Sequence, residues 1–95
     1  MKSYYSEFAA HALRCWARGY APRNEAEALA NQGVIRALDT VSDAEFLAAK
    51  WLYGIKKPFN MAITDYAVLH SVPEGQLWDM VRRLERRVAK ECGII

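Results

Sequence analysis

Apolar residues recur at steps of three and four along most of the chain, which is the period of an amphipathic helix. Four breaks interrupt this pattern, at residues 19–23, 39–42, 54–60 and 70–73, and five helices fit between them. No stretch alternates with a period of two for long enough to indicate a strand. The sequence therefore predicts an all-α fold, a single five-helix domain over residues 1–95.

The first two helices are predicted over about Tyr4 to Arg18 and from Asn24 to about Leu38. Asn24 is a favoured N-cap residue, with Glu27 three positions later. The residues expected to face the core are Tyr5, Phe8, Ala9, Ala12, Leu13 and Trp16 in the first helix, and Ala28, Leu29, Val34, Ile35 and Leu38 in the second.

The third helix is predicted to begin with a capping box. Ser42 and Glu45 have the S-x-x-E spacing in which each side chain binds the other residue's free backbone amide. This helix must end before Pro58. We expect it to bury Phe46, Leu47, the stem of Lys50 and Trp51, with Ile55 as a further candidate.

The last two helices are predicted over about 61–70 and from Pro73 onward. Pro suits the first turn of a helix, where its missing N–H costs nothing. An apolar seam follows at steps of four, three and four residues, formed by Leu77, Val81, Leu84 and Val88.

The composition argues against several classes of protein. The two cysteines do not have zinc-ligand spacing, and neither His11 nor His70 has a suitably spaced carboxylate or Cys partner, so we expect no metal, no cofactor and no enzyme activity. Cys15 is expected to be a small core residue. The absence of a long apolar run predicts a cytoplasmic protein without a membrane partner. Three Trp and five Tyr in 95 residues favour a homodimer.

Positive charge is concentrated late in the chain, although the formal net charge is only +2. Residues 82–90 hold five cations, Arg82, Arg83, Arg86, Arg87 and Lys90, against Glu85 alone. They are expected on the helix side away from Leu84 and Val88, where they either bind phosphates, form a solvated flank with Glu85 and Glu91 as partners, or meet an acidic protein.

Residues 61–91 have the spacing of a helix-turn-helix. Ala67 is the small residue needed where two helices meet, Val72 is placed to fill the turn, and Leu77 to anchor the second helix. Ser71 stands where Gly is usual, because that position often needs a positive φ. An ordinary helical hairpin explains the same spacing.

The segment from Phe46 to Gly93 resembles the carboxy-terminal helix-turn-helix of bacterial sigma factors and of the RinA/ArpU group of phage transcription regulators. The resemblance rests on the run "ALDTVSDAEFLAAKWLYGIKKPFNMAITDYAVLHSVPEGQLWDMVRRLERRVAKECG", which gives a capped helix of large apolar residues, a basic loop, a short helix and a long basic one. The opening "YYSEFAAHALRCWARG" resembles small phage-derived proteins of Firmicutes. The resemblance implies a transcriptional regulator that binds duplex DNA with its last helix in the major groove.

The resemblance also implies which residues meet DNA. The groove-facing positions would be Glu74, Gly75, Trp78, Asp79 and Arg82, flanked by Gln76 and Arg83, with Lys56 and Lys57 on the backbone. Glu74 and Asp79 repel phosphates, and Trp78 is bulky for a residue that reads bases. The alternative is therefore a helical protein-interaction module without DNA binding, which holds a protein partner through Trp78.

Overall fold

Five helices and their connecting turns make up the computed structural model, which describes residues 4–95. They are α1 (Tyr4–Ala17), α2 (Glu25–Leu38), α3 (Asp43–Gly54), α4 (Phe59–His70) and α5 (Glu74–Glu91). Residues 4–95 contain no strand, so the prediction of an all-α fold with five helices is confirmed. None of these helices is long and apolar enough to cross a membrane.

The predicted helix starts have the expected caps. The Asn24 side chain accepts a hydrogen bond from the Glu27 backbone N–H at 2.9 Å. Ser42 and Glu45 form the complete capping box: the Ser42 hydroxyl accepts from the Glu45 N–H, and the Glu45 carboxylate accepts from the Ser42 N–H, both at 3.2 Å. Both caps satisfy amides that a helix start would otherwise leave unpaired. Pro73 lies one residue before α5 rather than inside it.

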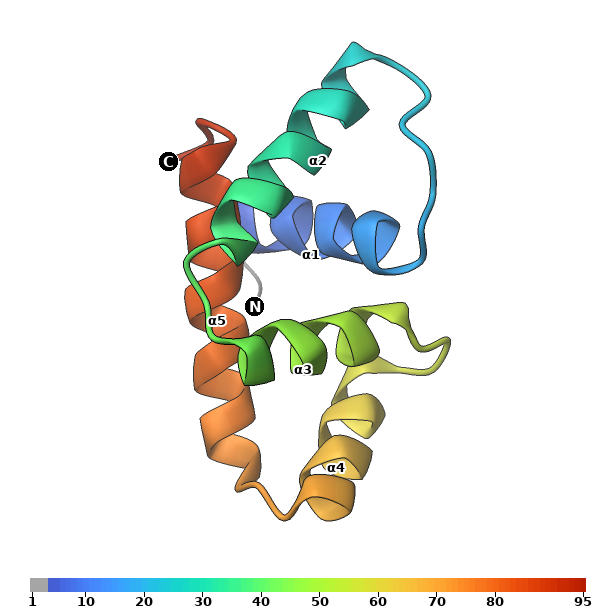
Figure 1. The fold of residues 1–95 in the computed structure, drawn as a ribbon, viewed down its shortest axis with the longest axis vertical. Helices are drawn as coiled ribbons and strands as arrows, with labels where there is room; N and C mark the ends of the chain where they lie inside the picture. Colours follow the sequence, from blue (N-terminus) through green and yellow to red (C-terminus); the bar gives the residue numbers. More distant parts are fainter. Residues whose placement is uncertain (1–3) are drawn as a thin grey trace.

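The helices form two pairs that lie beside one long helix. Figure 1 shows the α1–α2 pair next to the upper half of α5 and the α3–α4 pair next to its lower half. α5 packs against α1, α2 and α4, while α1 also packs against α3. α5 is therefore the element shared by both pairs.

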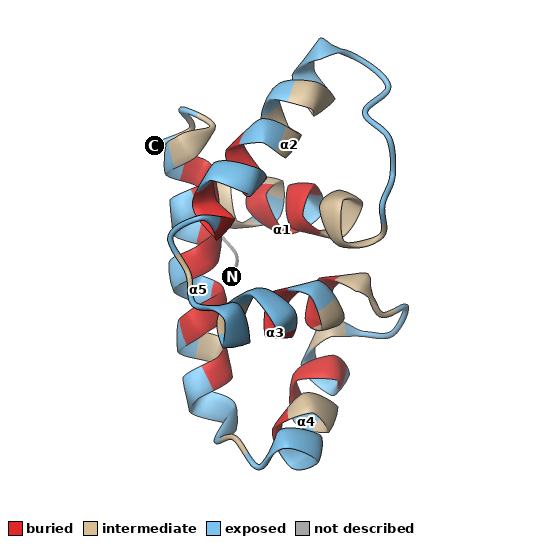
Figure 2. Ribbon diagram, in the orientation of Figure 1, coloured by how far each residue is buried: buried red, intermediate tan, exposed pale blue. Residues whose placement is uncertain are grey.

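Most of the predicted core residues of α1 and α5 are buried. The seam of Leu77, Val81, Leu84 and Val88 faces inward along the whole of α5, and the red segments in Figure 2 follow it. In α1, Ala9, Ala12 and Leu13 are buried, whereas the larger Tyr5, Phe8 and Trp16 are only half-buried.

The buried face of α2 differs from the predicted one. Leu29 and Ile35 are 56% and 47% exposed, so their placement in the core was wrong. Val34 and Leu38 are buried as predicted, and Gly33 and Ala37 are buried beside them. A Cβ on Gly33 would lie 2.3 Å from the Cys92 sulfur, which shows how closely the end of α5 approaches α2. The missing side chain at Gly33 allows that approach, whereas a leucine or isoleucine there would hold the helices apart.

In α3 the prediction was right for Trp51 and Ile55, which are half-buried against the core, and wrong for Phe46 and Leu47. Phe46 and Leu47 are exposed, Trp51 is half-buried, and the ammonium of exposed Lys50 lies 4.8 Å from the Trp16 ring centroid. The buried residues are Ala48, Ala49, Leu52 and Tyr53. Both faces of α3 carry apolar residues, so its sequence pattern alone did not distinguish them.

Candidate nucleic-acid interface

A tight turn of three residues joins α4 to α5. Ser71 has φ 53° and ψ 44°, the left-handed conformation expected at this position. Its N–H donates to the Val68 carbonyl at 3.4 Å, and the Val72 N–H donates to the Ala67 carbonyl at 3.0 Å. These two bonds are those of a Schellman motif, which ends a helix by satisfying its last carbonyls. Gly19 and Gly93 supply the left-handed residue after α1 and α5. Ser71 is the one non-glycine residue with positive φ in residues 4–95.

Apolar contacts fix α5 against α4 on both sides of this turn. Ala67, Leu77 and Met80 are buried, and half-buried Val72 packs against the same core. Burial of these residues leaves the opposite face of α5 to solvent.

A buried carboxylate anchors the middle of α5. Glu85 is 5% exposed and accepts hydrogen bonds from the Tyr53 hydroxyl of α3, at 2.7 Å, and from the Ser6 hydroxyl of α1. The two donors satisfy both carboxylate oxygens, as a buried acid requires. Burial and the adjacent Glu85 carboxylate raise the pKa of Tyr53 well above its ordinary value of 10.0. The alternative in which the cations form a solvated flank gave Glu85 as one of their partners, and for Glu85 that interpretation was wrong.

The five late cations lie on the solvent-exposed face of α5, and we call this set the basic face: Arg82, Arg83, Arg86, Arg87 and Lys90. All five are exposed, on the side away from buried Leu84 and Val88, which confirms their predicted placement. At 1.5 Å per residue, the basic face extends over about 12 Å of helix.

Three members of the basic face form ion pairs with nearby carboxylates. Arg83 lies 3.4 Å from Glu45 of α3, Arg87 lies 3.1 Å from Glu91, and Arg82 pairs with Asp79 one turn earlier. Glu91 also pairs with Arg36 of α2, at 3.3 Å. Among residues 4–95 no acidic group forms an ion pair with Arg86 or Lys90. These two cations are free to contact a polyanion without losing an internal partner.

The start of α5 is less basic than its end. Gly75, Gln76 and Asp79 are exposed, and exposed Glu74 accepts a hydrogen bond from the Thr64 hydroxyl of α4 at 3.0 Å. Trp78 is half-buried, with its ring edge-on to Phe59 of α4 and the two centroids 5.8 Å apart. Part of the Trp78 ring is thus occupied in holding α4 to α5.

The loop before α4 brings one lysine toward that helix. Lys57 forms an ion pair with Asp65 of α4, whereas exposed Lys56 has no ion-pair partner among the described residues. The structure therefore separates the twelve predicted site residues into a continuous basic face on α5, an acidic start of the same helix, and a lysine pair in a different loop.

Two arrangements were missed in the sequence. Glu85 lies between Val81 and Val88 on the apolar seam, four residues after one and three before the other, so its position indicated burial. His11 does have a cysteine partner: its Nε2 lies 3.7 Å from the Cys15 sulfur, one helical turn later on α1. The i, i+4 spacing of these two residues was the available signal. Cys15 itself is half-buried beside a pocket rather than in the core.

Two further findings concern metal ions and relatives of the chain. Within residues 4–95, no three His, Cys, Asp or Glu side chains lie close enough to hold a metal ion. No protein-family model, curated protein or solved structure matches the chain.

Proposed function

We propose that this protein is a small transcriptional regulator that binds duplex DNA through α5. The observation that supports this proposal most directly is the basic face, in which five exposed cations occupy one side of a helix over about 12 Å. Lys and Arg side chains in such an array bind the regularly spaced phosphates of a duplex and release its condensed counterions. The turn at Ser71, with Ala67, Val72 and Leu77 around it, supports a helix-turn-helix as the framework.

The ion pairs on the basic face do not prevent phosphate binding. The side chains of Arg82 and Arg83 are 67% and 68% exposed, and exposed ion pairs contribute only about 0–1 kcal/mol. A phosphate can therefore replace Asp79 or Glu45 at little cost. Arg86 and Lys90 need no such exchange, so they are the first residues to test.

The test measures binding to a random duplex of about 20 base pairs by fluorescence anisotropy, in a salt series from about 50 to 200 mM. We expect affinity to fall steeply with salt. Each cation that no longer binds a phosphate flattens the log–log slope by about 0.9, so Arg86→Gln with Lys90→Gln should reduce it by about 1.8. The control, Arg23→Gln with Lys50→Gln, removes the same charge from exposed positions off the basic face and should leave the slope nearly unchanged.

Two results would contradict the proposal. The first is a slope that both double variants change equally, because net charge rather than the basic face would then control binding. The second is equal competition by polyglutamate at the same charge concentration, which would indicate an acidic protein as the partner. A protein partner bound through Trp78 and a homodimer remain predictions.

A further inference from the structure

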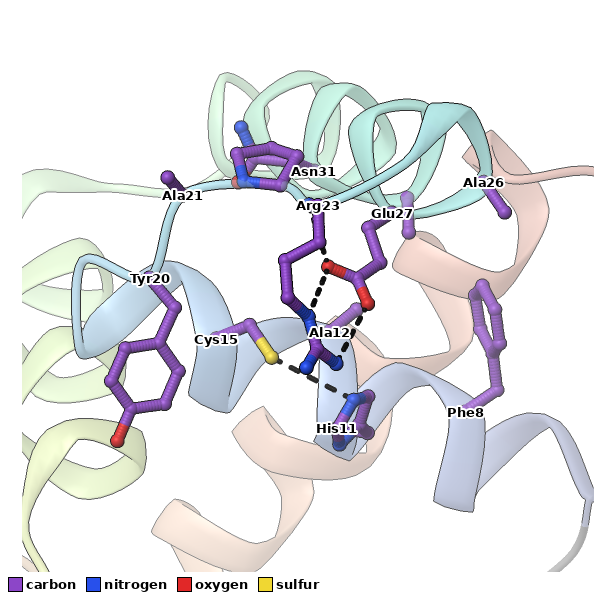
Figure 3. Close-up of a pocket in the computed structure, with 12 residues that line it drawn as sticks. Phe8, His11, Ala12, Cys15, Tyr20, Ala21, Arg23, Ala26, Glu27 and Asn31 are labelled. Carbon is purple, nitrogen blue, oxygen red and sulfur yellow. Dashed lines mark hydrogen bonds and ion pairs between the residues drawn. The ribbon is translucent and has the colours of Figure 1, made fainter.

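A pocket of about 460 Å³ lies between α1, α2 and the loop that joins them. It is on a different part of the molecule from the basic face, and its lining residues come from positions 8–31 (Figure 3). Its volume is within the range of small-molecule sites, about 300–1,000 Å³.

The pocket exists because small side chains line the space between two diverging helices. Ala12 of α1 and Ala26 and Ala30 of α2 face it, and none of them is long enough to fill it. The rings of Phe8 and Tyr20 lie at opposite sides of the close-up in Figure 3. The wall is therefore largely apolar, with an aromatic ring available at either side.

Among the described residues on the wall, the charged side chains are those of Arg23 and Glu27, and they neutralise each other. Arg23 binds Glu27 through its guanidinium, at 3.1 and 3.4 Å, and through its backbone N–H, at 2.9 Å. This pair ties the loop to the first turn of α2 and leaves the pocket with no net charge. A charged ligand would have to break the three hydrogen bonds of this pair to gain an opposite charge, whereas an uncharged ligand leaves them in place.

The uncharged polar residues on the described part of the wall are His11 on α1, Tyr20 in the loop and Asn31 on α2. His11 and Cys15 lie on the wall with their side chains 3.7 Å apart, and Figure 3 shows both beside the Arg23–Glu27 pair. The imidazole offers a ring nitrogen to a ligand hydrogen bond, and the sulfur is a soft apolar surface against which an aromatic ring packs well.

We propose that this pocket is a binding site for an uncharged, mainly aromatic small molecule with a hydrogen-bonding group that meets His11. The proposal goes beyond DNA binding, because it uses none of the residues of the basic face. Net neutrality, small apolar walls and few polar groups together favour this class of ligand over an anion or a cation.

Titration of the full chain with Prodan, an uncharged naphthalene ketone dye, tests the site. We expect a saturable rise in dye fluorescence with one site per chain. Ala26→Phe places a ring at the mouth of the pocket from an exposed position and should weaken binding about tenfold or more. Ala44→Phe is the matched control: Ala44 is also exposed and is also the second residue of its helix, between two acidic residues. It should bind the dye as the unmodified protein does.

A second measurement does not depend on the folding of the Ala26→Phe variant. In a Cys92→Ser chain, saturating Prodan should slow alkylation of Cys15 by iodoacetamide severalfold, because Cys15 lines the pocket. The anionic dye ANS should protect Cys15 less well. The proposal is overturned if Prodan does not bind saturably, if both phenylalanine variants bind it equally, or if Cys15 reacts at the same rate with and without it.

Discussion

The two ends of α5 pack against their neighbouring helices in opposite ways. Near its start, aromatic rings fill the space: Tyr53 lies 4.9 Å from Phe59, and Phe59 lies 5.8 Å from Trp78, centroid to centroid. Near its end, Gly33 and Ala37 of α2 and Ala89 of α5 are buried, and helix backbones approach closely. We call these regions the aromatic end and the small-residue end.

The difference shows how side-chain size determines where space remains. Rings at the aromatic end hold the helices apart and also fill the gap that results. At the small-residue end, α2 approaches α5 at Gly33, and alanines line the far side where α2 diverges from α1, so a pocket of about 460 Å³ remains. Stability should therefore depend on large residues at one end and on small residues at the other.

The largest expected effect is at the aromatic end. Tyr53→Ala removes a fully buried ring from the junction of α1, α3 and α5, and should lower the free energy of unfolding by about 3–5 kcal/mol. Urea denaturation, monitored by circular dichroism, measures this change. A decrease below about 1 kcal/mol would mean that the ring is not required to hold the helices apart.

Removing only the hydroxyl of Tyr53 should have a smaller effect, with a distinct pH dependence. Tyr53→Phe leaves Glu85 without one donor and should cost about 1–3 kcal/mol near neutral pH. Because the folded pKa of Tyr53 is raised above 10.0, its contribution is complete below pH 10.0 and is lost as the pH rises toward the folded pKa.

This second prediction is checked by urea midpoints between about pH 8 and pH 11. The midpoint of the unmodified protein should fall more steeply above about pH 10 than that of Tyr53→Phe. Tyr20→Phe is the control, because exposed Tyr20 has no side-chain hydrogen bond within the described residues. Parallel curves for the unmodified protein and Tyr53→Phe would show that ionisation of Tyr53 does not cause the loss of stability at high pH.

At the small-residue end, adding one methyl group should destabilise the protein. Gly33→Ala places a Cβ against the Cys92 sulfur, and the overpacking cost of about 1–3 kcal/mol exceeds the gain in helix propensity of about 1 kcal/mol. In a Cys92→Ala background, the same substitution should instead be neutral or stabilising. A double-mutant cycle, measured by urea denaturation, gives the coupling energy between residues 33 and 92. Additive effects of the two substitutions would exclude a contact between the new Cβ and the Cys92 sulfur.

The smallest expected effect distinguishes the two faces of α3. Leu47→Ala should change the free energy of unfolding by no more than about 0.5 kcal/mol, because Leu47 is 64% exposed. The matched substitution Leu52→Ala, five residues later in the same helix and 1% exposed, should cost about 2–5 kcal/mol. Equal decreases in the free energy of unfolding of the two variants would mean that Leu47 is buried, as the sequence pattern predicted.

The sequence by itself determined the helices and most of their ends, because these depend on local chemistry. The Asn24 cap, the Ser42–Glu45 capping box and the break at Pro58 act within a few residues of chain. The seam from Leu77 to Val88 was equally clear, since only one face of α5 is apolar. The same seam placed the basic face toward solvent.

Only the tertiary structure decided which face of α2 and α3 is buried, since both helices carry apolar residues on two sides. The missing side chain at Gly33 lets the end of α5 approach α2, a property that a count of hydrophobic positions does not capture. The partners of Glu85 come from α1 and α3, 79 and 32 residues away, and the pocket requires α1, α2 and their loop together. Contacts between residues so distant in sequence depend on how the helices pack, so no local pattern specifies them.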